Sequence, residues 1–325
     1  MHKPLLLTVA GLVAVAAPLQ AEDFTWDLYG KLDLQAIYAD ANLLRYADQG
    51  WQIEAPFSRL GFKADQALTD DLKLIAVYEW QVNGLDDSNK GHRLGSRNTY
   101  FGVASKTYGE LTFGKNDSKF KKSEGKIDLF NETLADMAQL TPGQDRLENI
   151  VSYQSPKLGL WQWAASYQTG ASDETAGGYD WSLSYGDAVF KQAPYYFAYA
   201  RANELNNISA NRVLANALLH ESTFGTLSGG LMWQYSEHQT KPSVGKPRRG
   251  NAWLAELQLK RDAIAYKLQY MQDHSRTRHA ENGYSWSVGA DYSIRKDLTT
   301  YLLATRLQLQ TQRDSAAAVG IRWLF

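Results

Sequence analysis

Residues 24–38 read FTWDLYGKLDLQAIY, and the alternation of side chains in this stretch decides the fold. One set of alternate positions is apolar and carries Phe24, Trp26, Leu28, Gly30, Leu32, Leu34, Ala36 and Tyr38. The other set is mainly polar and carries Thr25, Asp27, Lys31, Asp33 and Gln35. Successive side chains of a β-strand point to opposite faces, so a period of two predicts a strand with one apolar and one polar face.

The same alternation recurs along most of the chain, for example over residues 160–169, 179–187 and 284–295. No helical period of comparable length follows residue 21. The pattern predicts sixteen strands, at 24–40, 50–65, 71–84, 96–105, 110–116, 149–156, 159–169, 179–187, 188–202, 210–222, 226–237, 250–261, 262–273, 283–295, 297–308 and 315–325. Alternation fails around Pro56, where we expect a bulge or another irregularity of the strand.

A soluble β-sandwich is the commoner source of such a pattern, but three features favour a transmembrane barrel instead. Aromatic residues gather at the ends of the apolar faces, as they do at the two interfaces of a bilayer. The segments are about ten residues long, which is enough for a tilted membrane strand. Short turns such as 66–70 alternate with longer polar loops such as 238–250. We therefore expect an all-β fold, a sixteen-stranded antiparallel transmembrane β-barrel.

Composition and the first residues narrow the class of protein further. Residues 1–21 combine a basic start, an apolar core and a small residue at the end, which predicts a cleaved signal peptide, and residues 22–325 would form the barrel domain. The 34 Lys and Arg residues balance 35 Asp and Glu residues, so charge-driven binding of nucleic acid is not expected. The chain contains no Cys, which excludes disulfides and thiolate metal clusters.

Several short motifs resemble the general porins of Gram-negative outer membranes. Residues 26–33 (WDLYGKLD) are similar to the family's first strand, and the other fragments, in family order, are 58–63 (SRLGFK), 97–103 (RNTYFGV), 109–116 (GELTFGKN), 146–156 and 319–325 (VGIRWLF). The resemblance implies a homotrimer of barrels in the outer membrane, in contact with lipids and lipopolysaccharide. It also implies passive diffusion of ions and small hydrophilic solutes, without a cofactor.

Residues 117–145 form the longest stretch without alternation, and a long irregular insertion in a compact fold is usually functional. The position of this stretch in the sequence matches the porin loop that folds into the channel and narrows it. We expect Leu129, Phe130, Leu134 and Met137 to pack on the inner wall. The spacing of four between acids predicts one side of a short helical turn for Asp128, Glu132 and Asp136. An external amphipathic helix is the alternative, and the family's Pro-Glu-Phe-Gly-Gly motif is missing here.

The resemblance places channel-lining cations at Lys31, Arg59, Arg97 and Arg146. The alternation agrees for three of them, but Arg97 shares its parity with apolar Phe101 and Val103 and remains ambiguous. An Arg side chain on the lipid face costs about 2–4 kcal/mol at the bilayer midplane, which favours the inward position. We expect a transverse field between these cations and the acids of the loop.

Three other functions stay open. A sugar-selective porin would need inward aromatic residues in a track, for which Tyr29, Phe190 and Tyr196 have the right parity. An outer-membrane enzyme would need a catalytic group or a metal site, and we expect neither, since the histidines lie in loops or near a strand end and no nucleophile motif is present. An adhesive or purely structural barrel is the third possibility.

Overall fold

The computed structural model describes residues 24–55, 57–82, 94–170, 177–239 and 247–325. Most of them lie in strands: β1 (Phe24–Ala39), β2 (Gly50–Glu54), β3 (Arg59–Ala67), β4 (Leu72–Val82), β5 (Leu94–Ser105), β6 (Gly109–Asp117), β7 (Arg146–Gln154), β8 (Trp161–Gln168), β9 (Gly178–Gly186), β10 (Tyr195–Leu205), β11 (Ile208–Ser222), β12 (Gly225–His238), β13 (Arg249–Arg261), β14 (Ile264–Asp273), β15 (Gly283–Ser293), β16 (Leu298–Leu309) and β17 (Arg313–Leu324). Two short helices, α1 (Lys119–Lys122) and η2 (Met137–Gln139), lie between β6 and β7. No helix among these residues is long and apolar enough to cross a membrane.

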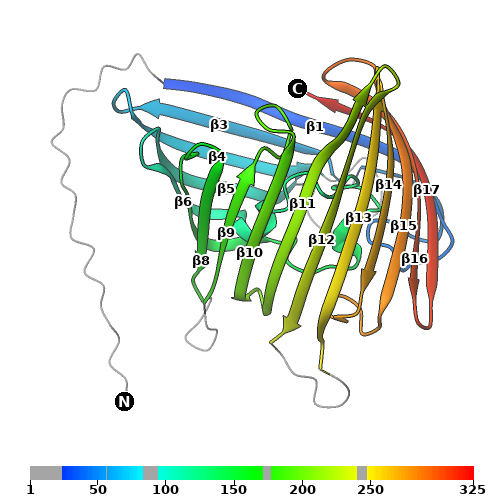
Figure 1. Cartoon of the computed structure of the whole chain (residues 1–325). Helices are drawn as coiled ribbons and strands as arrows, with labels where there is room; N and C mark the ends of the chain where they lie inside the picture. The colour runs from blue at the N-terminus through cyan, green and yellow to red at the C-terminus, as the bar shows by residue number, and fades with distance from the viewer. Residues whose placement is uncertain (1–23, 56, 83–93, 171–176, 240–246) are drawn as a thin grey trace.

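The strands form one closed antiparallel ring, which confirms the predicted fold class (Figure 1). β2 pairs with one half of β1 and β3 with the other half, so β2 and β3 together make one strand of a sixteen-stranded barrel. The interruption lies between Glu54 and Arg59, around the predicted irregularity, although residue 56 itself is outside the described residues.

β17 closes the ring by pairing with β1, and the backbone groups of Gly30 and Phe325 extend this pairing with two hydrogen bonds. A side chain on Gly30 would collide with the Phe325 ring, since an added Cβ would lie 2.3 Å from it. A closed ring leaves no unpaired strand edge, which is what a bilayer requires of a β-structure.

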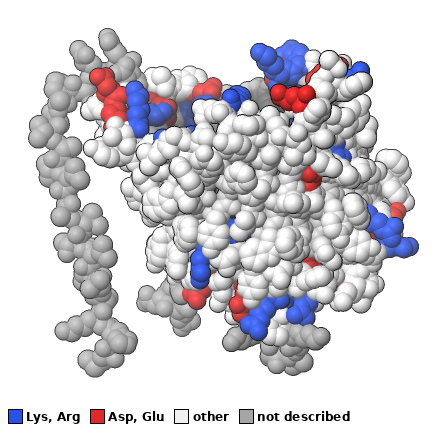
Figure 2. All heavy atoms as spheres, viewed as in Figure 1, with Lys and Arg blue, Asp and Glu red and all other residues white. Residues whose placement is uncertain are grey.

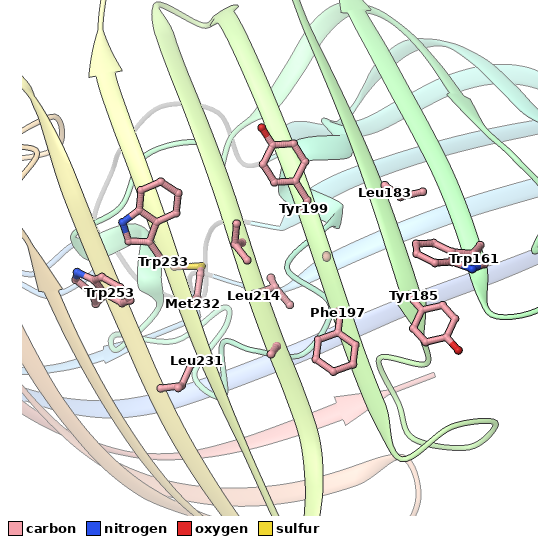
Figure 3. Close-up of a pocket in the computed structure, with 13 residues that line it drawn as sticks. Trp161, Leu183, Tyr185, Phe197, Tyr199, Leu214, Leu231, Met232, Trp233 and Trp253 are labelled. Atoms are coloured by element: carbon pink, nitrogen blue, oxygen red, sulfur yellow. The ribbon is translucent and has the colours of Figure 1, made fainter.

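The outward face of the barrel is apolar. Large hydrophobic residues such as Trp26 and Trp253 are 63% and 54% exposed there, whereas their sequence neighbours are buried inside or face the lumen. Figure 2 shows a broad uncharged band, with most Lys, Arg, Asp and Glu side chains near the two ends. A shallow groove follows β11, where the small residues Val213 and Ala215 lie between larger side chains of β10 and β12 (Figure 3). Such a surface suits acyl chains and not water.

The two ends of the barrel differ in their connections. At one end, here called the turn end, most connections are short, such as 68–71 and 262–263. The other end, here called the loop end, carries the connections 40–49, 118–145 and 274–282. The predicted signal peptide at 1–21 and residues 240–246 of the predicted loop at 238–250 fall outside the described residues.

One predicted strand, 188–202, is displaced in the structure, where β10 begins only at Tyr195. The Asp187 carboxylate accepts hydrogen bonds from the backbone N–H groups of Val189, Lys191 and Gln192, and this local turn replaces the start of the strand. At its other end, β10 continues to Leu205 and joins β11 through Asn206 and Asn207. Both have positive φ, as in the tight turns that connect paired strands.

The segment 118–145 lies inside the ring of strands (Figure 1). Its side chains Ile127, Phe130, Leu134, Met137 and Leu140 are almost fully buried in a cluster with inward residues of β10 to β14, β16, β17 and β1. The same segment also contacts β1, β3 and β5 through Glu132. Strands on opposite sides of a ring can share contacts with one segment only if that segment crosses the interior.

Candidate functional site: the channel constriction

Glu132 is the centre of the site, because its carboxylate contacts cations from three strands. Its Oε2 atom accepts a hydrogen bond from Lys31 Nζ on β1 at 2.6 Å. Its Oε1 atom accepts hydrogen bonds from Arg59 on β3 at 2.6 Å and from Arg97 on β5 at 3.1 Å. Burial alone would raise the pKa of Glu132, but attraction to these three cations outweighs burial and lowers the pKa below its usual range. Glu132 is therefore an anion that ties the loop to the barrel wall.

The local backbone explains why a carboxylate is needed at this point. Lys31 and Arg59 lie directly opposite each other on β1 and β3, and like charges in that register repel. Glu132 supplies the counter-charge that both require. Its φ is 56°, a left-handed conformation that is unfavourable for a residue with a side chain and is typical of functional sites.

Arg97 points into the barrel although Phe101, with the same parity, points outward. The reason is a bulge, since the register between β4 and β5 shifts between Tyr78 and Trp80 and reverses the alternation beyond that point. Arg97 Nε then donates a hydrogen bond to Glu79 Oε1 at 2.5 Å. The sequence pattern alone does not reveal this shift, which is why the position of Arg97 stayed ambiguous.

Glu79 is a site residue that the sequence analysis missed. It lies on β4, and its carboxylate also accepts a hydrogen bond from Tyr29 Oη at 3.1 Å and approaches Arg59 Nε at 3.7 Å. A single carboxylate in the mainly apolar segment LKLIAVYEWQV was a usable signal, because a charged residue in a membrane strand belongs on the lumen side.

Arg146, the fourth predicted cation, lies apart from Glu132. Its Nε atom donates a hydrogen bond to Asn98 Oδ1, and its guanidinium is 3.5 Å from Asp117. Asp117 also binds Lys121 Nζ at 3.0 Å. Arg146 therefore belongs to a second charged group, formed where β6 leads into the loop and β7 leaves it.

The other two predicted acids are used within the loop. Asp128 is 8% exposed, and its carboxylate accepts hydrogen bonds from the backbone N–H groups of Phe130 and Met137 and from the Gln269 side chain. Asp136 caps η2 by accepting from the N–H of Ala138, and it also accepts from the N–H of Glu132. Residues 128–136 form successive turns and not the expected helical turn, so the three acids do not share one side.

A cavity of about 200 Å³ lies beside Glu132, and we take it as the candidate opening of the channel at this site. Its charged lining residues are Arg45, Arg97, Lys121, Glu132, Asp136, Asp145 and Arg146. Its lining does not include Asp128, which is enclosed by the loop. It also does not include Lys31 and Arg59, which are bound by Glu132. The opening therefore presents both signs of charge, with the basic residues more numerous.

The three aromatic residues considered for a sugar track do not lie in one row. Tyr29 is on β1 and donates to Glu79, whereas Tyr196 is on β10, is buried beneath the loop and donates a hydrogen bond to the Ser123 carbonyl. Phe190 lies in the turn that precedes β10. Among the described residues, no group of three or more His, Asp or Glu side chains is arranged to hold a metal ion.

Comparisons with known proteins agree with this architecture. The sequence profile of the Gram-negative porin family matches residues 8–312. The outer membrane porin protein OmpD of Salmonella typhimurium strain LT2 is 23% identical over an alignment that covers 98% of this chain and 97% of OmpD.

Two solved structures have the same fold. The anion-selective porin from Comamonas acidovorans is similar with a TM-score of 0.71 and 17% identity, and the match covers 93% of this chain and all of that one. The trimer form of OmpT from Vibrio cholerae is similar with a TM-score of 0.70 and 14% identity, over 94% of this chain and 100% of OmpT. The closed barrel, the profile match over nearly the whole length and the OmpD relationship together establish that this chain belongs to the Gram-negative porin family.

Proposed function

We propose that the constriction around Glu132 controls which ions and small hydrophilic solutes pass through this channel. As a member of the porin family, the chain forms an outer-membrane channel for passive diffusion. The observation that carries the proposal is the contact between Glu132 and Lys31, Arg59 and Arg97, which fixes a charged loop across the interior of the barrel.

The physical basis is the cost of passing a charge through a narrow, polar opening. A solute that enters the cavity exchanges part of its hydration for the fixed charges of the lining, so the sign and placement of those charges select among ions. Glu132 balances one of the three positive charges of Lys31, Arg59 and Arg97, and Glu79 balances a second. Small polar solutes can align with the remaining field, whereas apolar solutes must displace oriented water without replacing its interactions.

Reversal potentials in planar bilayers test this proposal. Arg59→Gln and Arg146→Gln each remove a positive charge from the two charged groups at the constriction, and each variant should become more permeable to cations in a KCl gradient. Arg201→Gln is the matched control, because Arg201 lies on the outward face of β10 and should leave the reversal potential unchanged. Unchanged potentials in both constriction variants, in channels that still conduct, would remove these residues from the selectivity mechanism.

The assembly and processing of the chain are part of the same proposal. One structure with this fold is of a trimer form, and we extend that assembly to this chain as a homotrimer whose outward face meets lipids and lipopolysaccharide. We also propose that residues 1–21 are removed on export. Mass spectrometry of the detergent-solubilised protein tests both, since it should give three times the mass of a chain that begins at Glu22.

A further inference from the structure

Two aromatic residues meet at the constriction cavity, and the proposed function does not use either of them. Tyr46 lies in the connection 40–49, and Phe57 lies in the interruption between β2 and β3. Their ring centres are 4.8 Å apart and their planes are inclined by 66°, which is an edge-to-face arrangement. Both residues line the cavity beside Glu132. We call Tyr46 and Phe57 the aromatic patch.

The interruption between β2 and β3 turns Phe57 into the barrel. In β2 the odd-numbered residues Trp51 and Ile53 are 79% and 62% exposed on the outward face. In β3 the odd-numbered Arg59 points inward and contacts Glu132. The alternation therefore reverses between the two segments, and Phe57, which is 5% exposed, lies on the inner side together with Arg59. An uninterrupted continuation of β2 would place residue 57 on the outward face.

Tyr46 is held at the cavity through its neighbour Arg45. The backbone N–H of Arg45 donates a hydrogen bond to the Gln139 side chain at 3.1 Å, and the same side chain donates one to the Arg45 carbonyl at 3.4 Å. These contacts tie the connection 40–49 to the loop inside the barrel. Tyr46 has a φ of 68°, a left-handed conformation that is uncommon for a bulky residue and is typical of functional sites. Its side chain is 40% exposed, so a solute in the cavity can reach the ring.

The aromatic patch lies beside an available cation. The Cζ atom of Arg45 is 5.2 Å from the centre of the Tyr46 ring, and Arg45 lines the same cavity. Arg45 is exposed, and no carboxylate among the described residues forms an ion pair with it. Arg97 differs, since Glu79 and Glu132 both bind its guanidinium. Arg45 can therefore offer its planar fork of N–H donors to an incoming carboxylate.

We propose that Arg45, Tyr46 and Phe57 form a binding site for small aromatic carboxylates inside the channel. This inference rests on the proposed function, since the ligand must enter an open channel. The carboxylate of the solute pairs with the Arg45 guanidinium, and its ring packs against the aromatic patch and removes apolar surface from water. The cavity of about 200 Å³ limits the ligand to a single small ring, because drug-sized ligands occupy pockets of roughly 300–1,000 Å³.

The site requires both the ring and the charge of the ligand. A small aliphatic acid such as acetate pairs with Arg45 but leaves the aromatic patch in contact with water. A neutral aromatic amide covers the patch but leaves Arg45 without a counter-charge. A sugar can pack on a ring, but it carries no charge for a cavity in which basic residues outnumber acidic ones. An aromatic carboxylate satisfies both parts, so selection arises from their combination.

Block of the KCl current by benzoate tests the inference. The whole protein is placed in a planar bilayer in KCl at neutral pH, where benzoate is an anion, and benzoate, benzamide, acetate or glucose is added to both sides. Benzoate should give a saturable decrease in current. Its half-blocking concentration should be about tenfold or more below those of acetate and benzamide, because each of these lacks one of the two contacts. Glucose should give no saturable block.

Two variants each remove one part of the site. Arg45→Gln should raise the half-blocking concentration of benzoate by about tenfold, since a charge-assisted pair is lost. This variant should fold normally, because the contacts of Arg45 with Gln139 use its backbone. Tyr46→Leu keeps an apolar side chain but removes the aromatic face, and it should weaken the block several-fold. Tyr46→Phe keeps the ring and should retain the block of the parent protein.

Tyr108→Leu and Arg276→Gln are the matched controls. Tyr108 is 75% exposed in the turn between β5 and β6, at the turn end of the barrel. Arg276 lies in another connection of the loop end, and its guanidinium donates a hydrogen bond to the Pro247 carbonyl. Both residues lie outside the cavity lining, so both variants should show the same benzoate block as the parent protein.

The outcomes separate this inference from the proposed function. Equal block by benzoate and acetate, or by benzoate and benzamide, would overturn the site while the channel stands. Unchanged benzoate block in Arg45→Gln or in Tyr46→Leu would do the same. Saturable block by glucose at the concentrations that suffice for benzoate would also overturn it, in favour of a sugar site. A protein that conducts no ions at all would overturn the proposed function together with the inference.

Discussion

The two sides of the loop 118–145 are held to the barrel by different forces. One side is apolar, with Ile127, Phe130 and Leu134 almost fully buried in a cluster that includes inward residues of β10 to β14, β16 and β17. The other side is charged, and there Glu132 alone contacts β1, β3 and β5. Burial of apolar area is strong but tolerant of small shifts, whereas ion pairs require a fixed geometry. The comparison indicates that the apolar side keeps the loop inside the barrel and that the charged side sets the shape of the opening.

Phe130→Ala should give the largest effect, because it removes the main anchor of the apolar side. Phe130 is 2% exposed, and its ring lies against Gly289 of β15. Truncation of a buried Phe costs about 3–5 kcal/mol, and here this loss should weaken the docking of the loop inside the barrel. Cleavage by trypsin after Lys126, measured in the folded protein, should become faster by about a hundredfold or more, since the cleavage rate follows the population of the open loop.

The matched control is Phe101→Ala, because Phe101 is 54% exposed on the outward face and does not touch the loop. It should leave trypsin cleavage at Lys126 unchanged. If Phe130→Ala were as resistant as the parent protein, the apolar side could not be the main anchor.

Glu132→Gln tests the charged side and should give the next largest effect. The variant leaves Lys31, Arg59 and Arg97 without their shared counter-charge, so the reversal potential in a KCl gradient should shift several-fold in permeability ratio toward chloride. As a control, Glu148→Gln removes the same charge from an exposed pair with Lys115 and should change the reversal potential little. A cation-preferring Glu132→Gln channel would contradict the role given to this contact.

The sequence was sufficient for the barrel because its signal is repeated in every strand. Alternation and the aromatic ends of the strands depend on local order, and they predicted the ring. The resemblance of residues 117–145 to the porin loop that enters the channel predicted that Phe130, Leu134 and Met137 pack inside it. The displaced start of β10 was missed because the Asp187 turn consists of side-chain to backbone hydrogen bonds, which do not disturb the alternation.

The site was less predictable because it depends on contacts between distant segments. The equal spacing of Asp128, Glu132 and Asp136 makes no distinction among them, yet in the structure only Glu132 pairs with the cations of β1, β3 and β5. The position of Arg45 depends on packing between two loops, and the contact between Glu79 and Arg97 depends on the register of two strands. No local sequence pattern encodes either feature.

Glu124 should produce a smaller, pH-dependent effect. It is buried near Arg212, and burial raises its pKa to about 7, more than the attraction to Arg212 and Lys121 lowers it. Because the folded pKa exceeds the unfolded value, the contribution of Glu124 to stability is most favourable below pH 4.5 and is lost as the pH rises to about 7. The unfolding temperature of Glu124→Gln should therefore fall less between pH 4.5 and pH 7 than that of the parent protein. An identical fall in both proteins would show that Glu124 is not its source.

Lys63→Gln should give the smallest effect on the unfolding temperature. It separates two causes of a strong ion pair, a short distance between the charged atoms and burial from water. Lys63 and Asp27 pair at 2.8 Å on β3 and β1, the same strands that carry Arg59 and Lys31, but their side chains are 54% and 57% exposed. An exposed pair contributes about 0–1 kcal/mol and is screened by salt. The unfolding temperature of Lys63→Gln should therefore match that of the parent protein at high ionic strength. Lys31→Gln leaves part of the charge of the partly buried Glu132 uncompensated and should unfold at a lower temperature. Equal losses in the two variants would mean that the short distance, and not the exclusion of water, gives the Glu132 contact its strength.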